Sequence, residues 1–232
     1  METTESKSAL MIGIPVALAL GLIAGIVGTG MVKSHQYEMD LANAKAAAIV
    51  PPTTDTKAAN LRVVLNGLEK EHVELAAIAT KNGFDGRPDF AASAKSLDEN
   101  SVKLADAVGS VYGSDARDKF LAIWRSHITF FVNYTVAAKA GDKAGMDKAV
   151  NDLGGYIDAI SDFFSQANPN LPREAVKQLV TDHVTLLKSV VDAHGKGDYA
   201  TTYTQQNAAY EQIGKIADAI SGAIVKQNPS KF

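Results

Sequence analysis

The chain has no cysteine, and this absence removes several kinds of chemistry at once. Without a thiol there is no disulfide framework, no thiolate nucleophile and no cysteine-ligated zinc or iron–sulfur cluster. The chain also lacks a surplus of positive charge. It has 23 Lys and Arg against 26 Asp and Glu, which gives a net charge of −3. Proteins that bind nucleic acid hold its phosphates with such a surplus, so we expect no nucleic-acid partner.

The motifs of common catalytic sites are absent as well. The sequence contains no nucleophile elbow, no glycine-rich phosphate loop and no HExxH zinc-protease motif. We therefore expect a protein that is not an enzyme. Hydrophobic residues nevertheless make up 46% of the chain, which is enough to build a packed core.

The first strong positive feature is an uncharged run from Leu10 to Val32. As a helix it would be about 34 Å long, enough to cross a hydrocarbon core of roughly 30 Å. A cleaved signal peptide has a shorter apolar region, so residues 10–32 predict an uncleaved signal anchor in the lipid bilayer. Lys7 and Lys33 nearly balance under the positive-inside rule. Because a single anchor usually precedes an exported domain, we expect residues 1–9 to be a cytoplasmic tail.

Polar and alanine-rich sequence follows over residues 33–56, where Pro51-Pro52 interrupts any helix. We interpret this segment as a stalk or linker. The remaining residues, 57–232, are numerous enough for one sizeable core. The expected protein is thus a single-pass protein of the cell membrane, with its C-terminal domain outside the cytoplasm.

Apolar residues in this domain recur at intervals of three and four, as in helices, and alternating strand patterns are almost absent. The expected fold class is therefore all-α. Clusters of glycine, proline and asparagine separate the helices, and Asp89, Asp142 and Asp198 stand at N-cap positions. Gly154-Gly155, inside one helix, marks a close approach or an open space. The predicted helices cover residues 58–81, 89–112, 115–139, 143–166, 172–194 and 198–227.

The domain also repeats itself with a period of about 56 residues. Three histidines and three aspartates keep this spacing: His72, His127 and His183, and Asp106, Asp162 and Asp218. The repeat predicts three tandem αα-hairpins in a six-helix bundle, with the first helices of the hairpins all running one way. The aspartates project away from the apolar stripes, which favours solvation or salt bridges between helices.

The histidines lie within the apolar stripes of the first helices, so they are predicted to face inward at one level. Counting back through the hairpin turns places Asp98 opposite the first histidine and Tyr210 opposite the third. Imidazole and carboxylate ligands suit zinc, copper(II) or iron, and bundle cores commonly hold such sites. The predicted metal site consists of His72, Asp98, His127, His183 and Tyr210.

Other interpretations of the histidines remain open. Duplication of one hairpin would copy a structural, hydrogen-bonded histidine three times without any ligand. Haem is a further possible cofactor, because one inward histidine in a bundle is sufficient for it. The alternative function is a non-catalytic surface interaction or scaffold module, whose sign would be a large exposed apolar patch. The metal hypothesis instead requires the three imidazoles to meet near a common point.

Short motifs also connect the chain with a known group of proteins. They are EHV (71–73), LDEN (97–100), SVYG (110–113), WRSHI (124–128), NYT (133–135), ANPNLP (167–172) and the terminal NPSKF. From about residue 60 onward the chain resembles a family of uncharacterised bacterial cell-surface, membrane-anchored helical-repeat proteins. Members are sometimes loosely labelled copper amine oxidase-like, an activity that a lone Asn133-Tyr134 pair does not support. The resemblance implies an exported protein without an established chemistry. The short tail before the anchor favours a membrane-protein partner, and Ala17, Gly21 and Gly25, which recur at four-residue spacing in the span, leave self-association open.

Overall fold

The computed structural model describes residues 54–232, which form one compact unit. Its six helices are α2 (Lys57–Asp85), α3 (Phe90–Tyr112), α4 (Ser114–Ala140), α5 (Lys143–Ala167), α6 (Arg173–Gly195) and α7 (Tyr199–Gln227). The predicted all-α bundle is thereby confirmed. The predicted tail, the predicted span and the stalk as far as residue 53 lie outside the described residues. Among residues 54–232, no helix combines the length and the apolar character that crossing a membrane requires.

The ends of the helices follow local signals. α2 continues past its predicted end at residue 81 and closes at Gly86, whose φ of 69° is left-handed. Asp142 accepts a hydrogen bond from the backbone N–H of Gly145 at 3.0 Å, as the N-cap prediction requires. Asp198 caps α7 in the same way. Asp89 makes no such bond and pairs with Arg87 instead.

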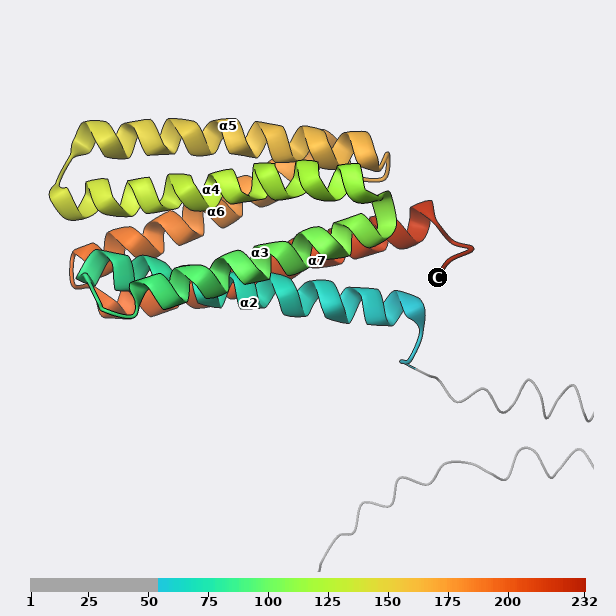
Figure 1. Cartoon of the computed structure of the whole chain (residues 1–232), viewed down its shortest axis with the longest axis horizontal. Helices are drawn as coiled ribbons and strands as arrows, with labels where there is room; N and C mark the ends of the chain where they lie inside the picture. The colour runs from blue at the N-terminus through green and yellow to red at the C-terminus, as the bar shows by residue number, and fades with distance from the viewer. Residues whose placement is uncertain (1–53) are drawn as a thin grey trace, which may run out of the picture. The chain divides into compact units, whose positions relative to one another are not determined.

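The six helices run roughly along one common direction (Figure 1). Their contacts divide them into an inner and an outer set. Each helix packs against the next in the chain, and α7 packs against α2, so the three hairpins close into a ring. The first helices of the hairpins, α2, α4 and α6, each contact the other two and form the inner set. α3, α5 and α7 each pack against two of these inner helices from outside.

One ion pair that follows the repeat joins each hairpin to the next. The three pairs use the repeated aspartates and three arginines of the inner helices, which recur with the spacing of the histidines. The Oδ1 to Nε distances are 2.7 Å for Asp106–Arg117, 2.5 Å for Asp162–Arg173 and 2.6 Å for Asp218–Arg62. The last pair links α7 to α2 and closes the ring. The expected salt-bridge role of the aspartates is confirmed, and the bundle has an approximate threefold relation between its hairpins.

Candidate functional site

The three repeated histidines meet at the centre of the inner helices. The ring centroid of His72 lies 5.3 Å from that of His127 and 6.1 Å from that of His183. The Nε2 atoms of His72 and His127 are 3.4 Å apart. None of the three residues is more than 4% exposed. The prediction that the rings share one buried level is confirmed, and we call these three side chains the imidazole layer.

Burial keeps the imidazole layer uncharged. Desolvation lowers the pKa of His127 to about 3, assisted by the neighbouring His183 and opposed by the backbone of Trp124. It lowers the pKa of His183 to about 4, with the nearby Gln212 amide acting in the other direction. The pKa of His72 is lowered well below its usual value by burial and by the other two rings. All three rings are therefore neutral at pH 7, which is the form that binds metal ions.

Several polar atoms in the layer have no hydrogen-bond partner. Within residues 54–232, Nδ1 of each histidine makes no hydrogen bond of normal geometry, and neither does Nε2 of His183. A buried polar group without a partner costs about 1 to 3 kcal/mol. Such a cluster of unpaired atoms is unusual in a folded domain and indicates either a ligand or buried water.

Two aromatic side chains surround the layer. The ring of Trp124 lies 4.9 Å from that of His72 and 4.8 Å from that of His127, between centroids. Tyr156 of α5 stacks on His127 with its centroid 4.5 Å away. Burial, with a smaller contribution from Glu69, raises the pKa of Tyr156 well above its usual value. The imidazoles therefore sit in a mostly apolar setting that favours neutral groups.

Glu69 is the functional candidate that the sequence analysis missed. It lies one turn before His72 on α2, is only 3% exposed, and its Oε2 atom has no partner among residues 54–232. Burial raises the pKa of this carboxyl to about 8. Two sequence signals point to it. Glu69 and His72 have the Glu-x-x-His spacing that supplies two metal ligands from one helix face, and the repeat places apolar residues, Trp124 and Val180, at the equivalent positions.

A small cavity connects Glu69 with the imidazole layer. Its volume is about 20 Å³, which is room for roughly one water molecule or one ion. Glu69 and His183 both line it, beside Trp124 and Tyr156. The unpaired carboxyl and an unpaired imidazole thus border the same space.

The donor atoms do not form a finished coordination set. Over the described part of the chain, no three His, Asp or Glu side chains are placed so that they could hold one metal ion together. Rotation of at least one histidine ring or of the Glu69 side chain would be required. The layer therefore brings together residue types that are able to bind metals, but not in the geometry of a coordination set.

The two predicted ligands on the outer helices lie elsewhere. Asp98 is exposed, and its two carboxylate oxygens accept hydrogen bonds from Arg125 at 2.7 and 2.8 Å. Tyr210 is 41% exposed, and Lys70 Nζ lies 5.0 Å from its ring centroid. Both residues stand at the edge of the inward face, where a cationic partner holds the side chain outside. The prediction that they face the histidines is wrong.

The outer helices turn a neighbouring set of residues inward instead, two positions further along each helix. These are Asn100, Tyr156 and Gln212, which keep the repeat spacing and are all buried. Asn100 Nδ2 donates to the carbonyl of Leu68 at 2.9 Å, and Gln212 Nε2 donates to that of Leu179 at 2.7 Å. Tyr156 stacks on His127 at the corresponding position. The repeat therefore identified equivalent positions correctly, while the assumed face of the outer helices was wrong.

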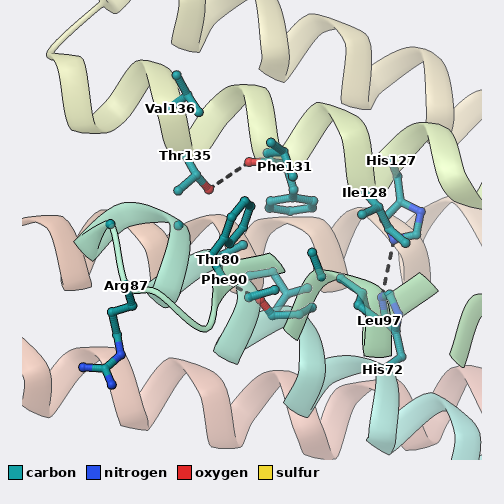
Figure 2. Close-up of a pocket in the computed structure, with 17 residues that line it drawn as sticks. His72, Thr80, Arg87, Phe90, Leu97, His127, Ile128, Phe131, Thr135 and Val136 are labelled. Carbon is teal, nitrogen blue, oxygen red and sulfur yellow. Dashed lines mark hydrogen bonds between the residues drawn. The ribbon is translucent and has the colours of Figure 1, made fainter. Parts of the chain in front are cut away.

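A larger cavity, of about 300 Å³, also reaches the imidazole layer (Figure 2). It lies between α2, α3 and α4, with His72 and His127 at one end and Arg87 at the other. Most of its lining is apolar. The layer is thus bordered by a cavity the size of a single ion and by one that can hold a small organic molecule.

Comparison of the chain with protein-family models, with curated proteins and with solved structures found no match.

Proposed function

We propose that this bundle is a non-catalytic, membrane-tethered domain outside the cytoplasm that binds a transition-metal ion or small cofactor at its imidazole layer. The observation that carries the proposal is the meeting of three neutral, buried imidazoles, four of whose six ring nitrogens lack partners. A metal ion would give several of these orphaned atoms a partner at once. Neutral imidazoles suit zinc, copper(II) and iron.

Glu69 supports a metal as the occupant. A divalent cation among neutral rings needs a nearby negative charge, because burying an uncompensated charge is costly. The carboxyl of Glu69 borders the small cavity that His183 also lines, so it is placed to supply that charge. The proposed ligands are therefore His72, His127, His183 and Glu69, after a change of side-chain conformation.

The test is metal analysis of residues 54–232, which contain every described helix and both core clusters. After purification without chelator, elemental mass spectrometry is expected to find about one transition-metal ion per chain. Replacement of His127 or His183 by Ala should abolish it, because each removes a ligand. Addition of Zn²⁺, Cu²⁺ or Fe²⁺ to chelated protein should raise the melting temperature, since the ion binds only the folded state.

His194→Ala is the matched control. His194 lies outside the imidazole layer and pairs with Asp85 at 2.9 Å, so its loss should leave the metal content unchanged. Absence of metal in the wild type, with no metal-dependent change in melting, would contradict the proposal. The histidines would then be a structural layer, and the alternative of a surface interaction or scaffold module would remain.

The tether is a separate part of the proposal, supported by the uncharged run at residues 10–32. The full chain is expected to sediment with membranes and to resist extraction with alkaline carbonate, whereas a chain that begins at residue 33 should be released. Protease added outside intact cells should remove the bundle if it lies beyond the cytoplasm. A bundle protected from that protease would contradict the proposed orientation.

A further inference from the structure

The larger cavity has the dimensions of a site for an elongated organic molecule. An apolar protein cavity of about 150 Å³ takes benzene, and this one has a volume of about 300 Å³. Its lining includes α2 residues from His72 to Gly83, a helical length of roughly 16 Å, and continues to Arg87 beyond the end of the helix. A molecule of about a dozen non-hydrogen atoms in an extended form therefore matches the space.

The walls of the cavity are mostly apolar, and its two imidazoles stand at one end. In Figure 2 the rings of Phe90 and Phe131 lie between Arg87 and the histidines. The hydroxyls of Thr80 and Thr135 also line the cavity, but each already donates to a backbone carbonyl at 2.8 Å. Among the lining residues, His72 and His127 have a buried Nδ1 atom without a partner, which a rotation of the ring would have to turn toward the cavity.

From this arrangement we infer that the cavity between α2, α3 and α4 binds an elongated apolar alcohol, with its hydroxyl at His72 and His127 and its chain directed toward Arg87. A hydroxyl both donates and accepts, so it matches a neutral imidazole, which also does both. The chain would cover the rings of Phe90 and Phe131. This site needs no metal ion, but it shares His72 and His127 with the proposed metal site.

The charge distribution selects an uncharged head group. The inner end of the cavity holds neutral imidazoles, and no Lys or Arg lines it there. A carboxylate at that end would be buried without a counter-ion. Arg87, at the opposite end, is exposed and already paired with Asp89. A fatty acid is therefore expected to bind more weakly than the corresponding alcohol.

The experiment uses 1-decanol as the probe, on residues 54–232 kept in chelator so that metal has no part in the result. Trp124, the only tryptophan of the chain, contacts both histidines and reports events at the inner end. A saturable change in its fluorescence is expected with 1-decanol. Decanoate should bind at least about tenfold more weakly, the factor that one unsatisfied polar group produces.

Two variants locate the site. Ala76→Leu and Ala79→Leu each place a larger side chain in the cavity, so each should weaken 1-decanol binding at least about tenfold without lowering the melting temperature. Ala116→Leu, on a half-buried position outside the cavity, is the matched control and should bind as the wild type does. His127→Leu should remove the preference for 1-decanol over decanoate.

Different results would overturn the site, the uncharged head group and the metal proposal. No saturable response to 1-decanol, or a response unchanged in both cavity-filling variants, would overturn the site. Equal binding of decanoate would overturn the uncharged head group. A chain that binds 1-decanol in chelator but takes up no metal would support this site and contradict the metal proposal, so the two failures are distinguishable.

Discussion

The side chain of Glu69 shows how one residue can distinguish three similar hairpins. The repeat places an acid in the first hairpin where the second has Trp124 and the third has Val180. Its pKa of about 8 means that the folded domain holds a proton on this carboxyl at pH 7, whereas the unfolded chain, with the ordinary pKa of 4.5, does not. Folding is therefore coupled to a proton at the centre of the bundle.

This coupling predicts the effect of Glu69→Gln on stability. For the metal-free wild type, the contribution of Glu69 is fully present below pH 4.5 and is lost as the pH rises toward 8, by up to about 1.4 kcal/mol per pH unit. The amide introduced by the substitution stays neutral, so the variant should lose less stability between pH 6.5 and 8.5. Urea denaturation across this range measures the difference. The exposed Glu211→Gln variant is the control, and parallel curves for Glu69→Gln and wild type would contradict the prediction.

The imidazole layer predicts the opposite dependence in acid. The unfolded chain protonates its histidines near pH 6.5, while the folded domain does so only near pH 3 for His127 and 4 for His183. Stability from these residues is therefore complete above pH 6.5 and falls as the pH decreases toward 4. Denaturation at pH 7 and pH 5 should show this loss in the wild type and a smaller one in His183→Gln. An equal loss in both would argue against a buried neutral His183.

At the scale of residues, the sequence predicted that the three histidines are buried, but it predicted only some of the residues that surround them. An apolar stripe with a repeated histidine determines burial directly, so His72, His127 and His183 could be placed. Asp98 and Tyr210 stand at the edge of a helix face, where the side chain follows its nearest partner. Those partners, Arg125 and Lys70, come from other helices, so the sequence of one helix does not reveal them.

At the scale of the helices, the number and order of the elements followed from periodicity, but the end of α2 did not. α2 runs through Asn82 and Gly83 to Asp85, because tertiary packing outweighs two weak helix formers. Gly154 and Gly155 were interpreted as a close approach or an open space. A Cβ atom at either position would meet nothing within 4 Å, so the space is open and no neighbour requires a glycine there.

The open space predicts that Gly155→Ala stabilises the domain. Alanine in a helix interior is favoured over glycine by about 1 kcal/mol, which corresponds to roughly 2 to 4 °C in melting temperature for a domain of this size. Gly109→Ala is the matched control, because a Cβ there would lie 2.9 Å from Cβ of Arg117. That variant should gain little or lose stability. Thermal melting followed by circular dichroism compares them, and a lower melting temperature for Gly155→Ala would refute the prediction.

For the whole molecule, the closure of the ring was not predicted, although the repeat was. The spacing of Asp106, Asp162 and Asp218 indicated equivalent positions, but only the structure shows that the last aspartate returns to Arg62 of the first hairpin. Periodicity along a chain is the same for an open array and for a closed ring. The difference depends on the rotation between successive hairpins, which no local pattern encodes.

Closure predicts that the domain tolerates circular permutation. The Arg62–Asp218 pair places the start of α2 and the end of α7 at one end of the bundle. A chain that begins at Ser114 and joins Phe232 to Thr54 through about ten Gly and Ser residues, with an average span of roughly 17 Å, should fold with the same helical content. A permutant opened between Arg125 and Ser126 would divide an inner helix and should lose its cooperative melting transition. Equal behaviour of the two would contradict the importance of the inner helices.

The approximate threefold relation between the hairpins also determines in how many equivalent orientations a molecule can bind at the centre of the bundle. Three identical hairpins assembled as a trimer would have to repeat every central side chain three times, and would offer a bound molecule three equal orientations. Because the hairpins are covalently joined, Glu69, Trp124 and Val180 can differ while the histidines remain the same. Of the three positions around the centre, only the one with Glu69 is acidic. A molecule bound at the axis therefore has one orientation of lower free energy than the other two.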